Sequence, residues 1–136
     1  MKQGFDHGFD GLSRIETIVV SCWLTWGAFG NGGVYCAMNN PFTLEEAAQA
    51  LDRIGHLLAA DALRAGSRKL FPNGQSSDRE ENDEAIFRYE DRTGNDPDDL
   101  FEEFAEASTD VTERLIEFIY KNWDETVDSD VRRMLT

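Results

Sequence analysis

The sequence predicts an all-α fold, a compact single-domain bundle of about seven short helices. Four capping boxes support helices, each a Ser, Thr or Asp followed three residues later by Glu, and they begin at Ser13, Thr43, Ser77 and Asp110. Apolar residues recur three or four positions apart, and no run of strand length alternates between apolar and polar residues. With 136 residues, 40% of them apolar, the chain is long enough for one domain with a sizeable core and short for two.

The first predicted helix begins at Ser13 and is the most apolar, so we expect it at the centre of the bundle. Its expected buried stripe follows helical spacing and consists of Ile15, Ile18, Val19, Cys22, Trp23 and Trp26. The two tryptophans are therefore assigned to the core and not to a stacking platform for bases. Glycines at positions 30, 32 and 33 predict a sharp end to this helix, which makes Asn31, Gly32 and Gly33 a structural turn.

Two further helices are expected before the middle of the chain. The first begins after Thr43 and ends at Gly55, and its buried face is Leu44, Ala47, Ala48, Leu51 and Ile54. The second runs from about Leu57 to Phe71, and its apolar positions are Leu58, Ala62 and Leu63. Gly66 is a weak spot in this helix, because glycine in a helix interior costs about 1 kcal/mol relative to alanine.

The charge of the chain is concentrated between positions 78 and 113, which hold 15 carboxylates and three arginines. This segment accounts for −12 of the formal net charge of −14. Its first helix is expected from the Ser77 box to about Asp91, with an inner side of Ile86, Phe87 and Tyr89. Glu84 and Arg88 lie four residues apart on the outer side and can pair. The aromatic anchors distinguish this segment from a disordered acidic tail.

A second acidic helix is expected from Asp96 to about Ala107, because Asp96 is a good N-cap and Pro97 suits the first helical position. Its inner face is Leu100, Phe101 and Phe104, and the opposite arc is Asp98, Asp99, Glu102, Glu103 and Glu106. A helix capped by Asp110 and Glu113 follows, with apolar residues Leu115, Ile116, Phe118, Ile119 and Trp123. A last helix is expected from about Val127, with Val131, Met134 and Leu135.

The composition points to a protein of a reducing, cytoplasmic compartment. Residues 1–12 are expected to form an irregular arm without the apolar run of a signal peptide. The apolar stretch from Ile15 to Phe29 contains Glu16 and falls short of the roughly 20 residues needed to cross a bilayer. Cys22 and Cys36 lie in apolar surroundings and are expected as buried, reduced thiols. The negative charge argues against direct binding to nucleic acid or to an anionic membrane.

Two loops have partial ligand-binding patterns. The glycines of residues 30–33 are not followed by the Gly-Lys-Ser/Thr of a phosphate loop and end a helix instead of opening one after a strand. Four residues match positions 1, 3, 5 and 12 of a calcium loop, namely Asp91, Thr93, Asn95 and Glu102. The sixth position of such a loop requires glycine and holds Asp96 here, so we assign both loops structural roles.

Catalysis and metal binding have little support in the sequence. Paired acids such as Glu80 and Glu84 share a helix face, but a hydrolytic metal site would need histidine partners. His7 lies in the N-terminal arm, and His56 is expected as a helix cap or a solvated side chain at a helix junction. No Ser/His/Asp or Cys/His set has a favourable spacing. We therefore expect no enzyme, no cofactor and no metal.

Several stretches resemble, in order, a family of small acidic bacterial DNA-mimic proteins that is typified by a neisserial double-stranded-DNA mimic. The most specific is Gly30-Asn31-Gly32-Gly33-Val34, preceded by an apolar helix and followed nine residues after Asn31 by Asn40. The others are Ile54-Gly55, the Leu70-Phe71-Pro72-Asn73-Gly74 turn, the acidic helix that contains Arg79, and Leu115 through Tyr120. The resemblance covers roughly residues 15 to 125.

This resemblance implies that residues 13–136 form an all-α, dimeric, acidic DNA-mimic-like domain. Such a domain displays carboxylates as duplex DNA displays phosphates, and it blocks the DNA site of a basic DNA-binding protein such as a transcriptional regulator. The expected partner-binding face is Glu81, Glu84, Asp91, Asp98, Asp99, Glu102, Glu103 and Glu106. Three alternatives stay open: an immunity or antitoxin-type inhibitor of a basic toxin or nuclease, a carboxylate-based metal-binding protein or enzyme, and a scaffold whose acids only keep it soluble.

Overall fold

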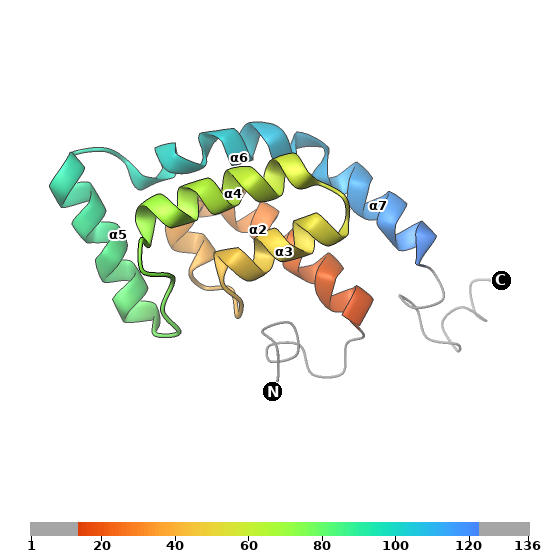
Figure 1. Ribbon diagram of the computed structural model, residues 1–136, viewed down its shortest axis with the longest axis horizontal. Coiled ribbons are helices and arrows are strands. Elements are labelled where there is room, and N and C mark those ends of the chain that lie inside the picture. Colours follow the sequence, from red (N-terminus) through yellow and green to blue (C-terminus); the bar gives the residue numbers. More distant parts are fainter. Residues whose placement is uncertain (1–13, 123–136) are drawn as a thin grey trace.

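The computed structural model describes residues 14–122, and that part of the chain contains helices and no strand (Figure 1). The α-helices are α2 (Arg14–Ala37), α3 (Leu44–Arg53), α4 (Leu57–Leu70), α5 (Arg79–Thr93), α6 (Glu102–Ala107) and α7 (Val111–Lys121). Two 3₁₀ helices join them, η1 (Pro97–Phe101) and η2 (Ser108–Asp110). The predicted all-α single domain is confirmed, and the predicted count of about seven helices is slightly off. The helix expected from Val127 lies outside the described residues, as do Ser13 and Trp123.

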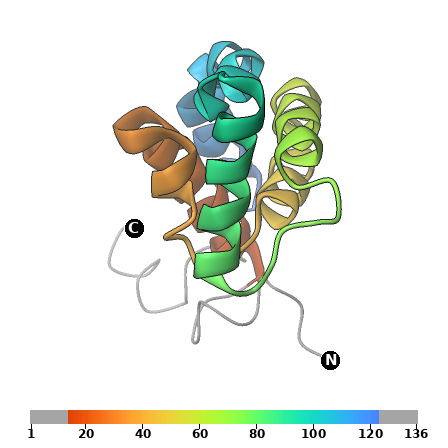
Figure 2. The same ribbon diagram turned by 90° about the vertical axis from the view of Figure 1, so that its left-hand side faces the viewer.

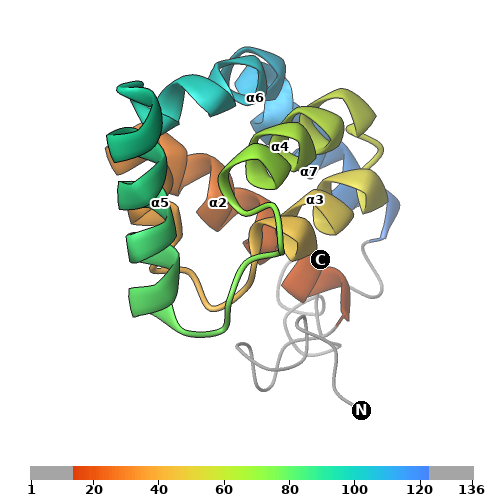
Figure 3. The same cartoon turned by 60° about the vertical axis from the view of Figure 1, so that its left-hand side comes forward.

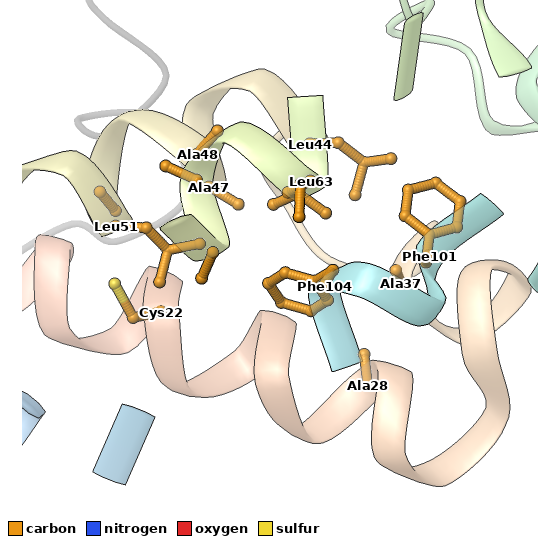
Figure 4. Packing of buried hydrophobic residues seen from close by; sticks show 14 of the residues in the cluster. Cys22, Ala28, Ala37, Leu44, Ala47, Ala48, Leu51, Leu63, Phe101 and Phe104 are labelled. Atoms are coloured by element: carbon orange, nitrogen blue, oxygen red, sulfur yellow. The ribbon is translucent and has the colours of Figure 1, made fainter. Parts of the chain in front are cut away.

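The core forms where α2, α3, α4 and the segment η1–α6 pack together (Figures 1 and 3). Phe104 of α6 projects between α2 and α4, and Phe101 lies beside it (Figure 4). Their exposed fractions are 1% and 2%. Both rings also contact Phe29 of α2, with centroid separations of 5.2 Å for Phe104 and 4.9 Å for Phe101. These aromatic contacts fix the acidic segment to the centre of the fold.

α2 is longer than the sequence predicted. The helix continues through Gly30, Asn31 and Gly32, and only Gly33 leaves the helical conformation, with φ 72° and ψ −154°. The prediction of a sharp end at this glycine run is therefore wrong, because three of its four residues keep helical geometry. Gly33 adopts a backbone conformation that is essentially restricted to glycine, and it kinks α2 before the last turn up to Ala37.

The buried face of α2 is also narrower than its apolar stripe. Ile18 and Cys22 are buried as predicted, but Trp23 is 48% exposed and Trp26 is only partly buried. The neighbouring buried positions hold smaller side chains, namely Thr17, Ser21, Thr25 and Ala28. α3 packs on α2 through a face rich in alanine, so small residues on α2 suit a close approach of the two helices. The assignment of both tryptophans to the core is thus wrong for Trp23.

Apolar side chains on three other helices are also exposed, because the neighbouring helices do not cover them. Phe87 of α5 was predicted on the inner side of its helix and is 63% exposed. Leu58 of α4 and Ile116 of α7, which were predicted only as apolar residues of their helices, are 70% and 48% exposed. By contrast, the core positions that the sequence predicted for α3 and its C-cap are all buried: Leu44, Ala47, Ala48, Leu51 and Ile54. Helical periodicity identifies an apolar arc, but the neighbouring helices decide how much of that arc is covered.

The cysteines are free in the structure but differ in accessibility. Cys22 is buried, and its burial raises the pKa of the thiol to about 12. Cys36 is only half-buried, so the expectation that both thiols are buried holds for Cys22 alone. None of the helices between residues 14 and 122 combines the length and the hydropathy of a membrane span.

The predicted helix caps are partly correct. The capping box of α3 is confirmed: the Glu46 amide donates to Thr43 Oγ1 at 3.1 Å, and the Thr43 amide donates to Glu46 Oε1 at 2.7 Å. α5 is capped by Asp78 instead of Ser77, because the Glu80 amide donates to Asp78 Oδ1 at 2.9 Å. Asp110 makes no capping bond to α7, so the predicted box there is wrong.

The carboxylate of Asp110 instead joins the α3–α4 turn to α7. His56 is 3% exposed, and its Nε2 lies 2.8 Å from Asp110 Oδ1. Arg114 Nε donates to Asp110 Oδ2 at 2.9 Å, and its Nη1 donates to the carbonyl oxygen of Gly55 at 3.3 Å. His56 occupies the N-cap position of α4, which the sequence predicted as one of two possibilities, but its side chain makes no capping bond and is not solvated. It is buried against a residue 54 positions away, which local pattern does not reveal.

We expect Asp110 to make stability depend on acidity. The hydrogen bond from Arg114, and secondly that from His56, hold the pKa of Asp110 below its usual value of 3.8. A depressed folded-state pKa stabilises the fold above the unfolded pKa, and this contribution is lost as the pH falls through the folded value. The free energies of unfolding of wild type and Asp110→Asn should therefore differ most above the usual carboxyl pKa and converge as the pH falls through the lowered pKa of Asp110. Glu117→Gln controls for net charge, and a gap between wild type and Asp110→Asn that is constant with pH would contradict the assignment.

Gly66 of α4, expected as a weak spot, is a packing contact. A Cβ atom there would lie 2.6 Å from the ring of Phe101 and 2.8 Å from the carbonyl oxygen of Leu100. Gly66→Ala should therefore lower the free energy of unfolding by about 1–3 kcal/mol, measured by urea denaturation. Gly30→Ala is the control, because that helical position has open space around it and should gain about 0.5–1 kcal/mol. Equal effects of the two substitutions would show that Phe101 does not pack on Gly66.

Candidate functional site: an acidic ridge on η1 and α6

The segment η1–α6 begins with the cap that the sequence predicted. The Asp98 amide donates to the carboxylate of Asp96 at 3.0 Å, and Pro97 occupies the first helical position. The first turn is a 3₁₀ helix, which the sequence did not predict, and α6 then continues to Ala107 as expected. Phe101 and Phe104 are buried and Leu100 is partly buried, so the predicted inner face is confirmed.

The opposite side of η1–α6 carries only carboxylates. We call this surface the acidic ridge and define it as Asp99, Glu102, Glu103 and Glu106. All four side chains are exposed, and none has a hydrogen bond or ion pair with another residue of the described part of the chain. No lysine or arginine occurs in residues 97–107. The negative charge of the ridge is therefore uncompensated by its own helices.

The ridge lies along the top of the molecule, with α2 on one side and α4 on the other (Figures 1 and 2). Between α6 and α4 is an open groove of about 490 Å³, which Glu103 and Glu106 line. Between α6 and the glycine-rich part of α2 is a second hollow of about 370 Å³, which Glu102 and Asn31 line. The carboxylates thus stand on a raised helix with a depression along each flank.

Asp98 has a structural contact that the sequence did not reveal. The Val34 amide donates to Asp98 Oδ1 at 2.8 Å, at the point where α2 resumes after the kink. A Cβ atom on Gly33 would lie 2.3 Å from both carboxylate oxygens of Asp98, so only glycine leaves room for this contact. Asp98 therefore acts as an N-cap for the last turn of α2. One carboxylate oxygen of this predicted face residue is occupied within the fold.

The acids of α5 are more strongly compensated than those of the ridge. Glu84 pairs with Arg88, as the sequence predicted, and Glu81 accepts a hydrogen bond from the hydroxyl of Ser76. Tyr35 of α2 donates its hydroxyl to Glu90 Oε1 at 2.9 Å, and burial together with this carboxylate raises the pKa of Tyr35 to about 12. Asp91 is exposed without such a contact among the described residues. α5 therefore offers fewer free charges than its composition suggests.

The eight predicted face residues are all exposed, and they lie on two helices. Glu81, Glu84 and Asp91 lie on α5, and the other five lie on η1–α6. The two helices meet at the turn that follows Gly94, where φ is 71° and α5 ends (Figure 1). Asp61 of α4 joins this charged surface by lining the groove opposite Glu103. The sequence contains no signal that would have placed Asp61 in the predicted partner-binding face, because its position there depends on how α4 packs against α6.

Metal-ligating side chains do not gather in the part of the chain that the structure describes. Within residues 14–122, no group of three or more His, Cys, Asp and Glu side chains is arranged to hold an ion. Of the residues that matched a calcium loop, Asp91 and Thr93 lie in α5, Asn95 lies in the turn after it, and Glu102 begins α6. The Thr93 hydroxyl donates to the Tyr89 carbonyl oxygen at 2.7 Å, so this side chain closes the last turn of α5.

The described helices all fall within a match to one protein family. Residues 10–122 match the model of the DMP19-like protein family. The chain belongs to this family. DMP19 proteins are DNA mimics, so the resemblance seen in the sequence is confirmed at the level of the family, whose members are generally not enzymes. Comparisons with curated proteins and with solved structures gave no match.

The contact of Asp98 with Val34 should contribute to stability. Asp98→Ala should lower the free energy of unfolding by about 1 kcal/mol, because the Val34 amide loses its acceptor. Asp98→Asn keeps an oxygen acceptor and should cost less. Asp99→Ala removes the neighbouring carboxylate, which has no such bond, and is the matched control. Thermal or urea denaturation measures these differences, and equal losses for Asp98→Ala and Asp99→Ala would show that the cap contributes nothing.

Proposed function

We propose that this protein is a non-enzymatic DNA mimic that binds a basic DNA-binding protein, such as a transcriptional regulator, and blocks its nucleic-acid site. The observation that supports the proposal best is the acidic ridge, where four exposed carboxylates stand without any internal partner among the described residues. Membership of the DMP19-like family supports the same function. The negative charge of the ridge and the family membership both favour a basic DNA-binding protein as the partner.

The physical basis is the way in which proteins bind duplex DNA. Lysine and arginine side chains that neutralise phosphates release condensed counterions, and this supplies most of the sequence-independent affinity. Carboxylates three or four residues apart on a helix have Cβ atoms about 5–6 Å apart, so Glu102, Glu103 and Glu106 form a dense local array. Because buried aromatic rings hold the array in place, binding needs little further ordering of the mimic. The ridge can therefore compete with DNA for a basic groove.

We assign the ridge a larger share of the binding than α5. The carboxylates of Glu84 and Glu81 already have partners within the molecule, whereas the ridge carboxylates have none among the described residues. Asp91 lies close to the corner between the two helices and extends the ridge toward α5. Asp98 is partly engaged with Val34, so it contributes its charge and less of its hydrogen-bonding capacity.

The proposal predicts that neutralising the ridge weakens partner binding more than neutralising acids elsewhere. The variant Glu102→Gln/Glu106→Gln and its control Glu113→Gln/Glu117→Gln each remove two exposed carboxylates four residues apart, and the control pair lies on α7. The ridge variant should lose about three- to tenfold in affinity at low salt, because an exposed charge pair contributes about 0–1 kcal/mol. The control should lose much less, since screening over about 10 Å at 0.1 M salt limits its reach.

The measurement begins with capture of the partner from native lysate, elution in a salt gradient and identification by mass. Each variant is then titrated against the purified partner at two salt concentrations, with and without a competing DNA duplex. Equal losses for the ridge variant and the α7 control would refute the ridge as the binding surface. A partner that binds without competing with DNA would replace DNA mimicry by another kind of inhibition, such as that of an immunity protein or antitoxin.

A further inference from the structure

The groove between α4 and α6 combines an apolar floor with an acidic rim. Its floor consists of carbon-rich side chains, namely Leu58, Ala62, Ala65 and Ala107. Leu58, Ala62 and Ala65 follow one another at helical spacing along α4, and Ala107 closes the floor from α6. Leu58, which lines this groove, is 70% exposed. A large aliphatic side chain therefore stands beside the acidic ridge without cover from the described part of the fold.

The rim of the groove has one sign of charge. Asp61 lies on the α4 side, and Glu103 and Glu106 lie on the α6 side. Arg64 reaches Asp61 only at 3.8 Å, because its guanidinium is bound to Asp52 at 2.6 Å and to Glu45 at 3.0 Å. No lysine or arginine lines the groove itself. Charge complementarity thus favours a cationic occupant over a neutral or acidic one.

We propose that this groove receives one large aliphatic side chain of the partner, presented between lysine or arginine residues on a basic amphipathic helix. The inference rests on the proposed function and adds to it the chemistry that selects the partner. The flanking cations of such a helix reach Asp61, Glu103 and Glu106, while its aliphatic side chain covers Leu58 and the alanine floor. An amphipathic helix laid in a groove is a common mode of peptide recognition.

This arrangement separates binding into two contributions with different salt dependence. The contacts of the rim weaken as salt rises, because the charges are screened and fewer counterions are released. Burial of apolar surface against Leu58 does not weaken in that way. A mimic with such a groove can hold its partner at salt concentrations where a duplex bound through phosphates alone dissociates. The groove therefore distinguishes a partner that carries the aliphatic residue from other basic proteins.

The test uses two synthetic helical peptides as probes. Both carry arginines on either side of a central position, which is leucine in one peptide and alanine in the other, and fluorescence anisotropy measures their affinity for the full chain. At high salt the leucine peptide should bind wild type about five- to tenfold more tightly than the alanine peptide. Leu58→Ala should remove this difference. Leu57→Ala is the matched control, because Leu57 is 60% exposed next to Leu58 and does not line the groove.

The inference is overturned if the two peptides bind wild type equally at every salt concentration, or if Leu57→Ala and Leu58→Ala remove the preference to the same extent. Circular dichroism confirms that each variant is folded, and both leucines are exposed, so neither substitution opens a cavity. The Glu102→Gln/Glu106→Gln variant separates this inference from the proposed function. If that variant weakens both peptides while the preference for leucine is absent, the groove inference alone fails. If the variant binds both peptides as tightly as wild type does, the acidic ridge is not the binding surface, and the proposed function is refuted as well.

Discussion

The packing of Phe101 and Phe104 between α2 and α4 is the contact on which the acidic ridge depends. η1 and α6 together have 11 residues and carry five carboxylates, and so short a helix would not be stable alone in water. Burial of a phenylalanine contributes about 1.5–3 kcal/mol, and both rings are almost fully buried. Gly66 leaves the room that lets the Phe101 ring lie so close to α4. Packing on one side of the helix therefore holds the repelling charges on the other.

The kink of α2 belongs to the same assembly. Gly33 adopts a conformation that side-chain-bearing residues avoid, and the turn that follows needs an acceptor for the Val34 amide. Asp98 supplies that acceptor from η1, one residue before the acidic ridge begins. The strongest feature of the family resemblance, the glycine-rich stretch, thus has a physical role: it forms the place on α2 where the acidic segment docks. The helices that carry the acidic ridge are therefore attached to the centre of the fold by the apolar contacts of Phe101 and Phe104 and by the hydrogen bond between Asp98 and Val34.

The two acidic helices differ in how they use their carboxylates. α5 lies at one end of the molecule and buries only Asn82 and Ile86, and several of its acids are paired with arginines or hydrogen-bonded to other residues (Figure 2). The ridge is packed more deeply and keeps its charges free. Acid content alone would have ranked the two helices as equals. The difference arises because a carboxylate that already has a cation or donor nearby gains less from a partner's lysine or arginine.

By itself the sequence determined the fold class, most helix boundaries, the Thr43 and Asp96 caps, and the exposure of all eight predicted face residues. These features depend on interactions within about four residues, which pattern and composition record. Only the tertiary structure decided that Trp23 and Leu58 are exposed, that Asp98 binds Val34 across 64 positions, and that His56 meets Asp110. The physical reason is that an apolar arc or a carboxylate acquires its role from whichever helix packs against it. That choice depends on contacts between distant segments, which periodicity cannot encode.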